Sequence, residues 1–156
     1  MGGPDNADPM LFQAIVEQSS DAVIFAGRDG AIRIWNRGAE AVFGYSAAEV
    51  FGKGLDLIIP ERLRSAHWDG FRRAVDTGQT KYAGRVLTTR SVHKNGSKLY
   101  VDLSFGLVRD RAGVVAGAFA IGRDCTARFL AEKELQLQVR DLEKKLEVAS
   151  GRSGAA

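Results

Sequence analysis

Apolar and polar positions in the first quarter of the chain change from a helical to a strand-like period. Apolar residues spaced along one face of a short helix come first, namely Leu11, Phe12, Ile15 and Val16. Two apolar runs of strand length follow, at 22–26 and 31–35, and an Asp-Gly turn separates them. Because Asp-Gly between such runs is a strong hairpin signal, we predict a β-hairpin. In its second strand, Ile32 and Ile34 alternate with Arg33, as in a half-buried strand.

The middle of the chain combines helix caps with short apolar segments. Asn36 is a good N-cap for a helix over 37–43, and a glycine follows that segment. Ser-Ala-Ala-Glu at 46–49 is a capping box, in which each end satisfies a backbone donor of the other. A longer helix is predicted from residue 60 or 61 to about 77, again followed by glycine.

The second half of the domain has the period of two that is typical of strands. We predict strands over 82–92, 99–109 and 114–123, joined by Asn-Gly and Ala-Gly turns as an antiparallel meander. The apolar face of the second strand consists of Leu99, Val101, Leu103, Phe105 and Leu107. Because an isolated hairpin is marginal in water, the first hairpin is expected to pair with this meander.

From residue 126 the composition becomes that of a charged helix without Gly or Pro up to residue 150. Apolar residues step by four and three along it, which is a coiled-coil seam of about two heptads: Leu135, Val139, Leu142 and Leu146. The seam predicts a homodimer. We expect a disordered lead-in at 1–9, a globular domain at 10–125, the helix at 126–150 and a disordered tail at 151–156.

Composition excludes several classes of protein. The net charge is +3 with both signs mixed along the chain, so no nucleic-acid partner is expected. The single cysteine excludes an internal disulfide and a four-cysteine metal site. There is no apolar stretch of membrane-spanning length and no signal-peptide pattern, so we expect a cytoplasmic protein without a membrane partner. No nucleophile–base pair can be identified, and we expect no enzymatic activity.

Several short motifs, each weak alone, together resemble a PAS domain over residues 11–129. They lie at 20–24, 30–36, 39–46, 49–52, 58–60, 93–97 and 121–126. The resemblance implies an α+β fold: a five-stranded antiparallel sheet with short helices on one face, and a C-terminal coiled-coil helix through which the signal leaves. The inner face of the sheet and the helices would enclose a ligand pocket. Asp124 and Thr126 resemble the exit motif of the family, and either residue type is a good helix cap.

The segment 58–67 is similar to the corresponding stretch of haem-binding PAS oxygen sensors, in which the residue matching His67 is the proximal iron ligand. Neutral imidazole is a natural ligand of iron. The resemblance further implies basic residues near the haem propionates, Arg73 and Lys81, and apolar pocket residues, Leu103 and Phe105. Haem b is therefore the leading candidate cofactor.

One position departs from the oxygen-sensor pattern. Those sensors have an arginine facing bound oxygen, and this chain has Leu87 there. Arg85 lies two residues earlier and is expected on the same strand face, because side chains alternate along a strand. The competing interpretation of His67 is a polar helix residue, as in PAS domains without haem. The function would then be that of a cofactor-free interaction and homodimerisation domain.

Other residues admit several interpretations. The sequence around Cys125 resembles the reactive-cysteine motif of flavin-binding PAS relatives. Cys125, however, follows the last predicted strand, whereas the reactive cysteine of those relatives lies among the short helices. This placement argues against flavin and favours a structural cysteine. Trp68 fits a pocket wall and a dimer face equally well. The basic residues of the longest helix of the domain are expected on a solvated face: Arg62, Arg64, Arg72 and Arg73.

Overall fold

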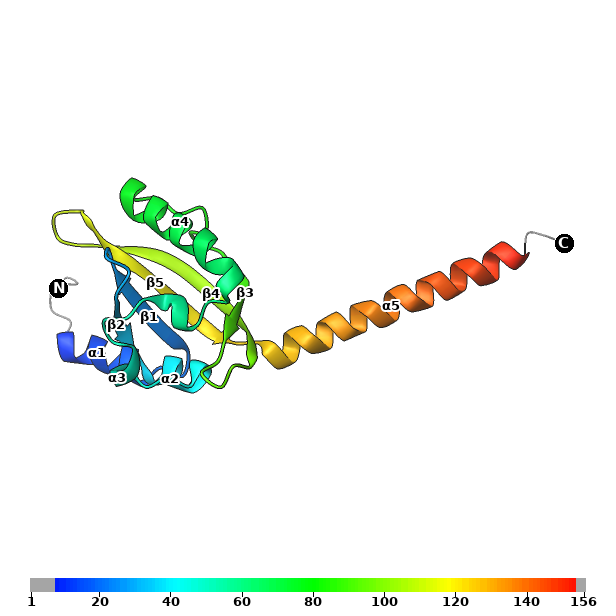
Figure 1. Ribbon diagram of the computed structural model, residues 1–156, viewed down its shortest axis with the longest axis horizontal. Helices are drawn as coiled ribbons and strands as arrows, with labels where there is room; N and C mark the ends of the chain where they lie inside the picture. Colours follow the sequence, from blue (N-terminus) through cyan, green and yellow to red (C-terminus); the bar gives the residue numbers. More distant parts are fainter. Residues whose placement is uncertain (1–7, 154–156) are drawn as a thin grey trace, which may run out of the picture. The chain divides into compact units, whose positions relative to one another are not determined.

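The structure is a computed structural model that describes residues 8–153 (Figure 1). Residues up to Asp124 form one compact unit and those from Cys125 onward form a second. The elements in chain order are α1 (Pro9–Gln18), β1 (Ala22–Gly27), β2 (Ile32–Trp35), α2 (Arg37–Phe43), α3 (Ala47–Val50), the 3-10 helix η2 (Leu55–Leu57), α4 (Glu61–Thr77), β3 (Val86–Val92), β4 (Lys98–Arg109), β5 (Val115–Asp124) and α5 (Thr126–Ser153).

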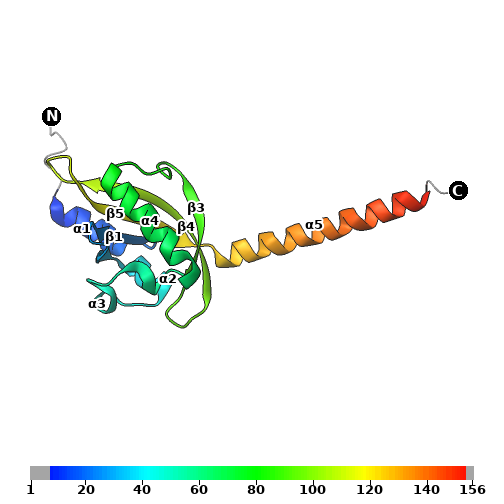
Figure 2. The ribbon, with the colours of Figure 1, turned by 45° about the horizontal axis from the view of Figure 1, so that its top comes forward.

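The first unit is built on the expected five-stranded sheet. The strand order is β2-β1-β5-β4-β3, and all four neighbouring pairs are antiparallel. Helices α2, α3 and α4 lie over the same face of this sheet (Figures 1 and 2). The α+β architecture predicted from the sequence is therefore confirmed.

The core lies between this inner face of the sheet and the helical layer. Its fully or almost fully buried members include Ile24, Ile32, Trp35, Ala39, Phe43, Val50, Ile58, Leu99, Val101 and Leu103. The predicted apolar face of β4 is thus confirmed at Leu99, Val101 and Leu103. Phe105 is half-buried and packs against the same cluster.

Helix α1 begins earlier than the sequence pattern predicted. The Asp8 side chain accepts a hydrogen bond from the Met10 amide at 2.9 Å, and Pro9 occupies the first helical turn. Proline is favoured there because its missing N–H would have no partner within the helix. Assigning Pro9 to a disordered lead-in was therefore wrong. Residues 1–7 of that lead-in lie outside the described residues.

A bulge changes which side chains of β2 face the core. Phe25 pairs with Ile34, but the next residue, Ala26, pairs with Ile32, so Arg33 is the extra residue. A bulge of this kind breaks the alternation of side chains. Ile32 is consequently buried and Ile34 is 39% exposed, contrary to the simple alternation of the sequence.

The predicted caps of the short helices are confirmed. The Asn36 side chain accepts hydrogen bonds from the amides of Ala39 at 2.9 Å and of Val23 at 2.8 Å, which fixes the start of α2 against β1. Gly44 ends α2 with a left-handed φ of 81°, a conformation that glycine adopts without strain. Ser46 and Glu49 form the capping box of α3.

Strand β3 begins four residues later than predicted. The chain from Lys81 to Gly84 forms a turn, and Gly84 has a φ of 72°. The Arg85 amide donates to the Tyr82 carbonyl at 3.1 Å, so pairing with β4 starts at Val86. Arg85 is therefore not a strand residue, and the expectation that alternation places it beside Leu87 was wrong.

Helix α5 constitutes most of the second unit. It begins at Thr126 and continues through Ser153, so residues 151–153 extend the helix instead of belonging to a disordered tail. Residues 154–156 of that tail lie outside the described residues. The seam side chains of this helix are all exposed in the single chain, from 46% at Val139 to 69% at Leu146. Within residues 8–153, no helix is long and apolar enough to cross a membrane.

Candidate functional site

His67 lies in the middle of α4 and is half-buried. Its Nδ1 atom is buried and has no hydrogen-bond partner among the described residues. Burial lowers the pKa of His67 below its ordinary value of 6.5, and the nearby Asp56 carboxylate opposes this in part. The imidazole is therefore neutral at neutral pH, which is the form that binds metals.

Two aromatic rings of α4 lie next to His67. The centroids of the His67 and Trp68 rings are 4.9 Å apart in an edge-on arrangement, and Phe71 stacks at 6.3 Å. Trp68 donates a hydrogen bond to the Asp56 carboxylate at 2.7 Å, and its ring packs against Gly30. A Cβ at Gly30 would come within 2.8 Å of that ring. Trp68 thus anchors α4 to the β1–β2 turn.

The predicted apolar pocket residues lie together on the inner face. Leu87 is directly opposite Leu103 in the pairing of β3 with β4. Leu103 is 6% exposed, and Phe105 follows two residues later on the same face. The Tyr82 ring, from the loop before β3, lies 6.2 Å from the Phe105 ring. The structure therefore brings Leu87, Leu103 and Phe105 into one apolar surface.

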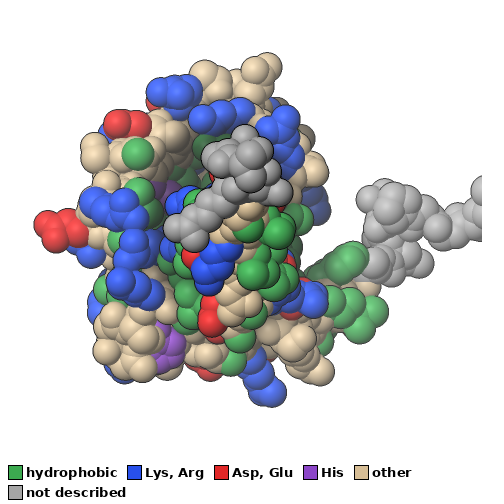
Figure 3. All heavy atoms as spheres, turned by 90° about the vertical axis from the view of Figure 1, so that its right-hand side faces the viewer, with side chains coloured by type: hydrophobic (Ala, Val, Ile, Leu, Met, Phe, Trp, Pro, Cys, Tyr) green, Lys and Arg blue, Asp and Glu red, His purple; other side chains and the backbone are tan. Residues whose placement is uncertain are grey.

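The predicted propionate-binding cations are exposed. Arg73 lies on α4, whereas Lys81 and Arg85 lie in the loop between α4 and β3. None of the three forms an ion pair with another residue in the range 8–153, and the Lys81 ammonium lies 5.1 Å from the centroid of the Tyr82 ring. On the face of the molecule that Figure 3 shows, Lys and Arg side chains lie at several separate places. Of the four arginines of α4 expected on a solvated face, Arg64 is half-buried and donates to the Ile59 carbonyl at 3.0 Å.

These residues fit the chemical requirements of haem by type. His67 provides a half-buried neutral imidazole with an unpartnered nitrogen. Haem sites require such an axial ligand, an apolar surrounding and cations for the propionates at the rim. The apolar residues are buried or half-buried, and the cations are exposed as a rim position demands. Cys125, in contrast, is 6% exposed and follows the last strand, far along the chain from the short helices.

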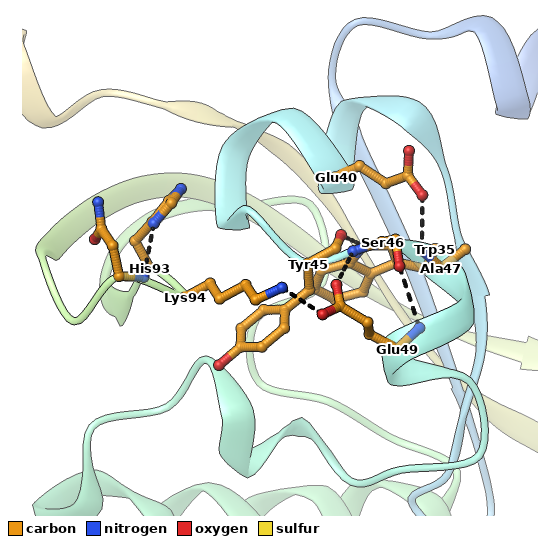
Figure 4. A network of polar contacts seen from close by, with 9 residues as sticks. Trp35, Glu40, Tyr45, Ser46, Ala47, Glu49, His93 and Lys94 are labelled. Atoms are coloured by element: carbon orange, nitrogen blue, oxygen red, sulfur yellow. Dashed lines mark hydrogen bonds and ion pairs between the residues drawn. The ribbon is translucent and has the colours of Figure 1, made fainter.

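A second cluster joins the β3–β4 hairpin to the helical layer, and sequence reasoning missed it (Figure 4). The Lys94 ammonium forms an ion pair with the Glu49 carboxylate and lies 5.7 Å from the centroid of the Tyr45 ring. The Lys94 amide donates to the Phe43 carbonyl at 2.9 Å. The His93 ring occupies the space that a Cβ would need at Gly44. We call this set of contacts between residues 43–49 and 93–94 the hairpin clasp.

The electrostatics of the hairpin clasp are testable by pH titration. The hydrogen bond from Lys94 is the main reason that the pKa of Glu49 falls from 4.5 to about 2, and the Ser46 amide of the capping box contributes. Since the folded-state pKa is lowered, the ion pair stabilises the fold above pH 4.5 and this effect is lost as the pH falls towards 2. NMR titration of the Glu49 carboxyl should give a midpoint near 2. Lys94→Met should move it upward, and an unchanged midpoint would contradict the ion pair.

Comparison with known proteins gives the family. Residues 16–129 match the family described as the PAS fold. The chain therefore belongs to the PAS family. It is a PAS sensory domain of the kind used in signal transduction.

The relatives in this family include named sensors. The chain is 27% identical over 135 residues to the oxygen sensor protein DosP of Escherichia coli, a match that covers 86% of this chain and 16% of DosP. It is 26% identical to the sensor protein FixL of Bradyrhizobium diazoefficiens, covering 80% of this chain and 24% of FixL. An uncharacterized protein of Azorhizobium caulinodans is 31% identical, with 80% and 17% covered. The chain thus spans a quarter or less of the length of these relatives.

Solved structures agree on the fold. The PAS domain of a protein from Colwellia psychrerythraea superposes with a TM-score of 0.65 at 21% identity, covering 77% of this chain and 99% of that domain. An RNA-binding light-oxygen-voltage receptor gives a TM-score of 0.68 at 21% identity, covering 93% of this chain and 41% of the receptor. At these identities the likeness establishes the PAS fold alone.

Proposed function

We propose that this PAS domain is a sensory and dimerisation module that binds a small ligand or cofactor on its inner face, with haem as the leading candidate. The observation that supports this most strongly is the half-buried neutral imidazole of His67, whose Nδ1 has no partner among the described residues. The likeness to proteins named as an oxygen sensor and a sensor supports the same function.

Each candidate residue has a definite role in this proposal. His67 would hold the iron, and Leu87, Leu103 and Phe105 would exclude water from it. Arg73, Lys81 and Arg85 would neutralise the propionates at the exposed rim. Haem would supply an iron centre that binds diatomic gases, and the protein would tune it through these surroundings.

The output is proposed to pass through α5 in a homodimer. Four seam residues of α5 are exposed in the single chain: Leu135, Val139, Leu142 and Leu146. With a β-branched residue at one seam position and leucines around it, two parallel helices are the favoured assembly. In such a dimer, binding of a ligand would change the geometry of the two paired α5 helices.

A cofactor-free interaction domain is the second candidate function. The observation that favours it is the tight packing of the inner face itself, where Phe43, Val50 and Val101 are fully buried. In that case His67 would be a polar residue of α4, and the exposed seam of α5 would be the functional surface.

The absorption spectrum of the protein after reconstitution with haemin tests the proposal. One haem per chain with a sharp Soret band is the expected result, and reduction should shift that band. Protein that passes through gel filtration without haem would favour the cofactor-free domain.

A further inference from the structure

The two edge strands of the sheet, β2 and β3, differ in what pairs with their backbones. At the β2 edge, the Ile32 amide donates to the Lys53 carbonyl and the Ile32 carbonyl accepts from the Gly52 amide, both at 2.8 Å. The segment after α3 therefore covers this edge. On β3, a backbone hydrogen bond to another part of the described chain forms only at the end of the strand, from the Val92 amide to the Ile58 carbonyl at 2.9 Å.

The rest of the β3 edge is open. The His93 amide donates to the Ser97 carbonyl at 2.9 Å, so the β3–β4 hairpin closes with a hydrogen-bonded pair. Bonded and non-bonded pairs alternate along antiparallel strands, and the outward bond of Val92 agrees with this alternation. The residues before Val92 whose backbone N–H and C=O groups point away from β4 are therefore Val86, Thr88 and Arg90. None of these backbone groups has a hydrogen-bond partner among residues 8–153.

The chain around this open edge carries an excess of positive charge. Residues 77–101 include five basic residues and no acidic one: Lys81, Arg85, Arg90, Lys94 and Lys98. Lys94 is paired with Glu49, and the other four form no ion pair within residues 8–153. The Asp102 carboxylate, directly opposite Thr88 on β4, already accepts a hydrogen bond from the Thr88 hydroxyl at 2.5 Å.

Charge decides which kind of strand fits this edge. Unpaired backbone groups at a sheet edge are a template for an added strand, and partner proteins use such edges to bind extended peptides. A second copy of this chain would place β3 beside β3 and bring the same basic residues together, which is unfavourable. An extended segment with acidic side chains would instead meet charges of opposite sign.

We propose that the β3 edge from Val86 to Arg90 is a docking site for an extended acidic segment of a partner protein, which pairs with it as an additional strand. The outward backbone groups of Val86, Thr88 and Arg90 hold the main chain of the segment. Arg85 and Arg90, at the two ends of the edge, attract its carboxylates. The site requires no ligand on the inner face and is therefore independent of the proposed haem binding.

An NMR titration of the full chain with an acetylated peptide of alternating glutamate and valine tests the site. The amide signals of Val86, Thr88 and Arg90 should shift and saturate, whereas the amide signals of β2 should not. The same peptide with lysine in place of glutamate should bind at least about tenfold more weakly, because its charge repels that of the edge. Added salt should weaken binding of the glutamate peptide.

Thr88→Pro removes the outward N–H of one edge residue. Proline is tolerated on an edge strand when its N–H would face away from the sheet, so the fold should remain. Affinity for the glutamate peptide should fall about tenfold, since a backbone hydrogen bond is lost. Thr88→Ala is the matched control, because it keeps the N–H and removes only the hydroxyl that bonds Asp102. It should bind the peptide like the unmodified protein.

Val86→Pro, with Val86→Ala as its control, repeats the test at the first residue of β3 should Thr88→Pro fail to fold. Equal peptide affinity in the proline and alanine variants would overturn strand addition. Tighter binding of the lysine peptide would overturn the acidic partner, and no saturable binding of the glutamate peptide would overturn the site. A proline variant that weakens self-association while the peptide does not bind would identify the edge as a contact between copies and overturn the proposal.

Discussion

Replacing His67 by alanine is expected to abolish specific haem binding while the fold remains intact. His67 is the half-buried imidazole of α4, with one nitrogen unpartnered, and the chain contains one other histidine, His93. Iron held by a single protein ligand loses its site when that ligand is removed. Titration with haemin should show an affinity that is lower by at least about a hundredfold. Each tenfold loss of affinity corresponds to about 1.4 kcal/mol of binding free energy. Circular dichroism should be unchanged.

His93→Ala is the matched control, because it removes the same chemical group from the hairpin clasp. His93 packs on Gly44, and its Nδ1 accepts the Asn95 amide at 3.1 Å. We expect this variant to bind haem as tightly as the unmodified protein. Retention of the full haem spectrum in His67→Ala would contradict the assignment of the ligand.

Leu87 of β3 gives the same proposal a consequence for gas binding. It lies opposite Leu103 and offers no hydrogen-bond donor from its side chain. A charged donor stabilises the negative charge that develops on bound oxygen, whereas carbon monoxide depends on it far less. Gas titration of the reconstituted protein should therefore give weak oxygen affinity and comparatively strong carbon monoxide affinity.

Leu142→Asp is expected to convert the proposed homodimer into a monomer. Leu142 is 58% exposed in the single chain, so the substitution costs little there. In a seam it would bury one carboxylate per chain, and each buried charge costs several kcal/mol. The dissociation constant measured by sedimentation equilibrium should rise at least ~100-fold.

Leu137→Asp provides the control, because Leu137 is 56% exposed on the same helix but is not a seam position. The two variants have identical composition. If both variants weaken the dimer equally, or if the unmodified protein is a monomer at tens of micromolar, the assignment of Leu142 to a dimer seam is contradicted.

Features set by neighbouring residues were predictable from the sequence. The Asn36 cap, the Gly44 stop and the Ser46–Glu49 capping box each depend on residues within one helical turn, and the structure confirms all three. The helical position of His67 followed from the same kind of signal, since glycine ends α4 at Gly78.

Features set by distant residues were not predictable. Lys94 and Glu49 are 45 residues apart, and no local pattern relates them. The bulge at Arg33 depends on how β1 pairs with β2, and the late start of β3 depends on the turn conformation of Gly84. Alternation alone could not reveal either, because it assumes an uninterrupted strand.

The most direct test of the central claim is the resonance Raman spectrum of the reduced, reconstituted His93→Ala variant. With His93 removed, His67 is the only histidine that the chain retains. We predict an iron–histidine stretching band that shifts when the histidine is isotopically labelled. Bound haem without such a band, or no bound haem at all, would contradict His67 as the residue on which this domain senses its ligand.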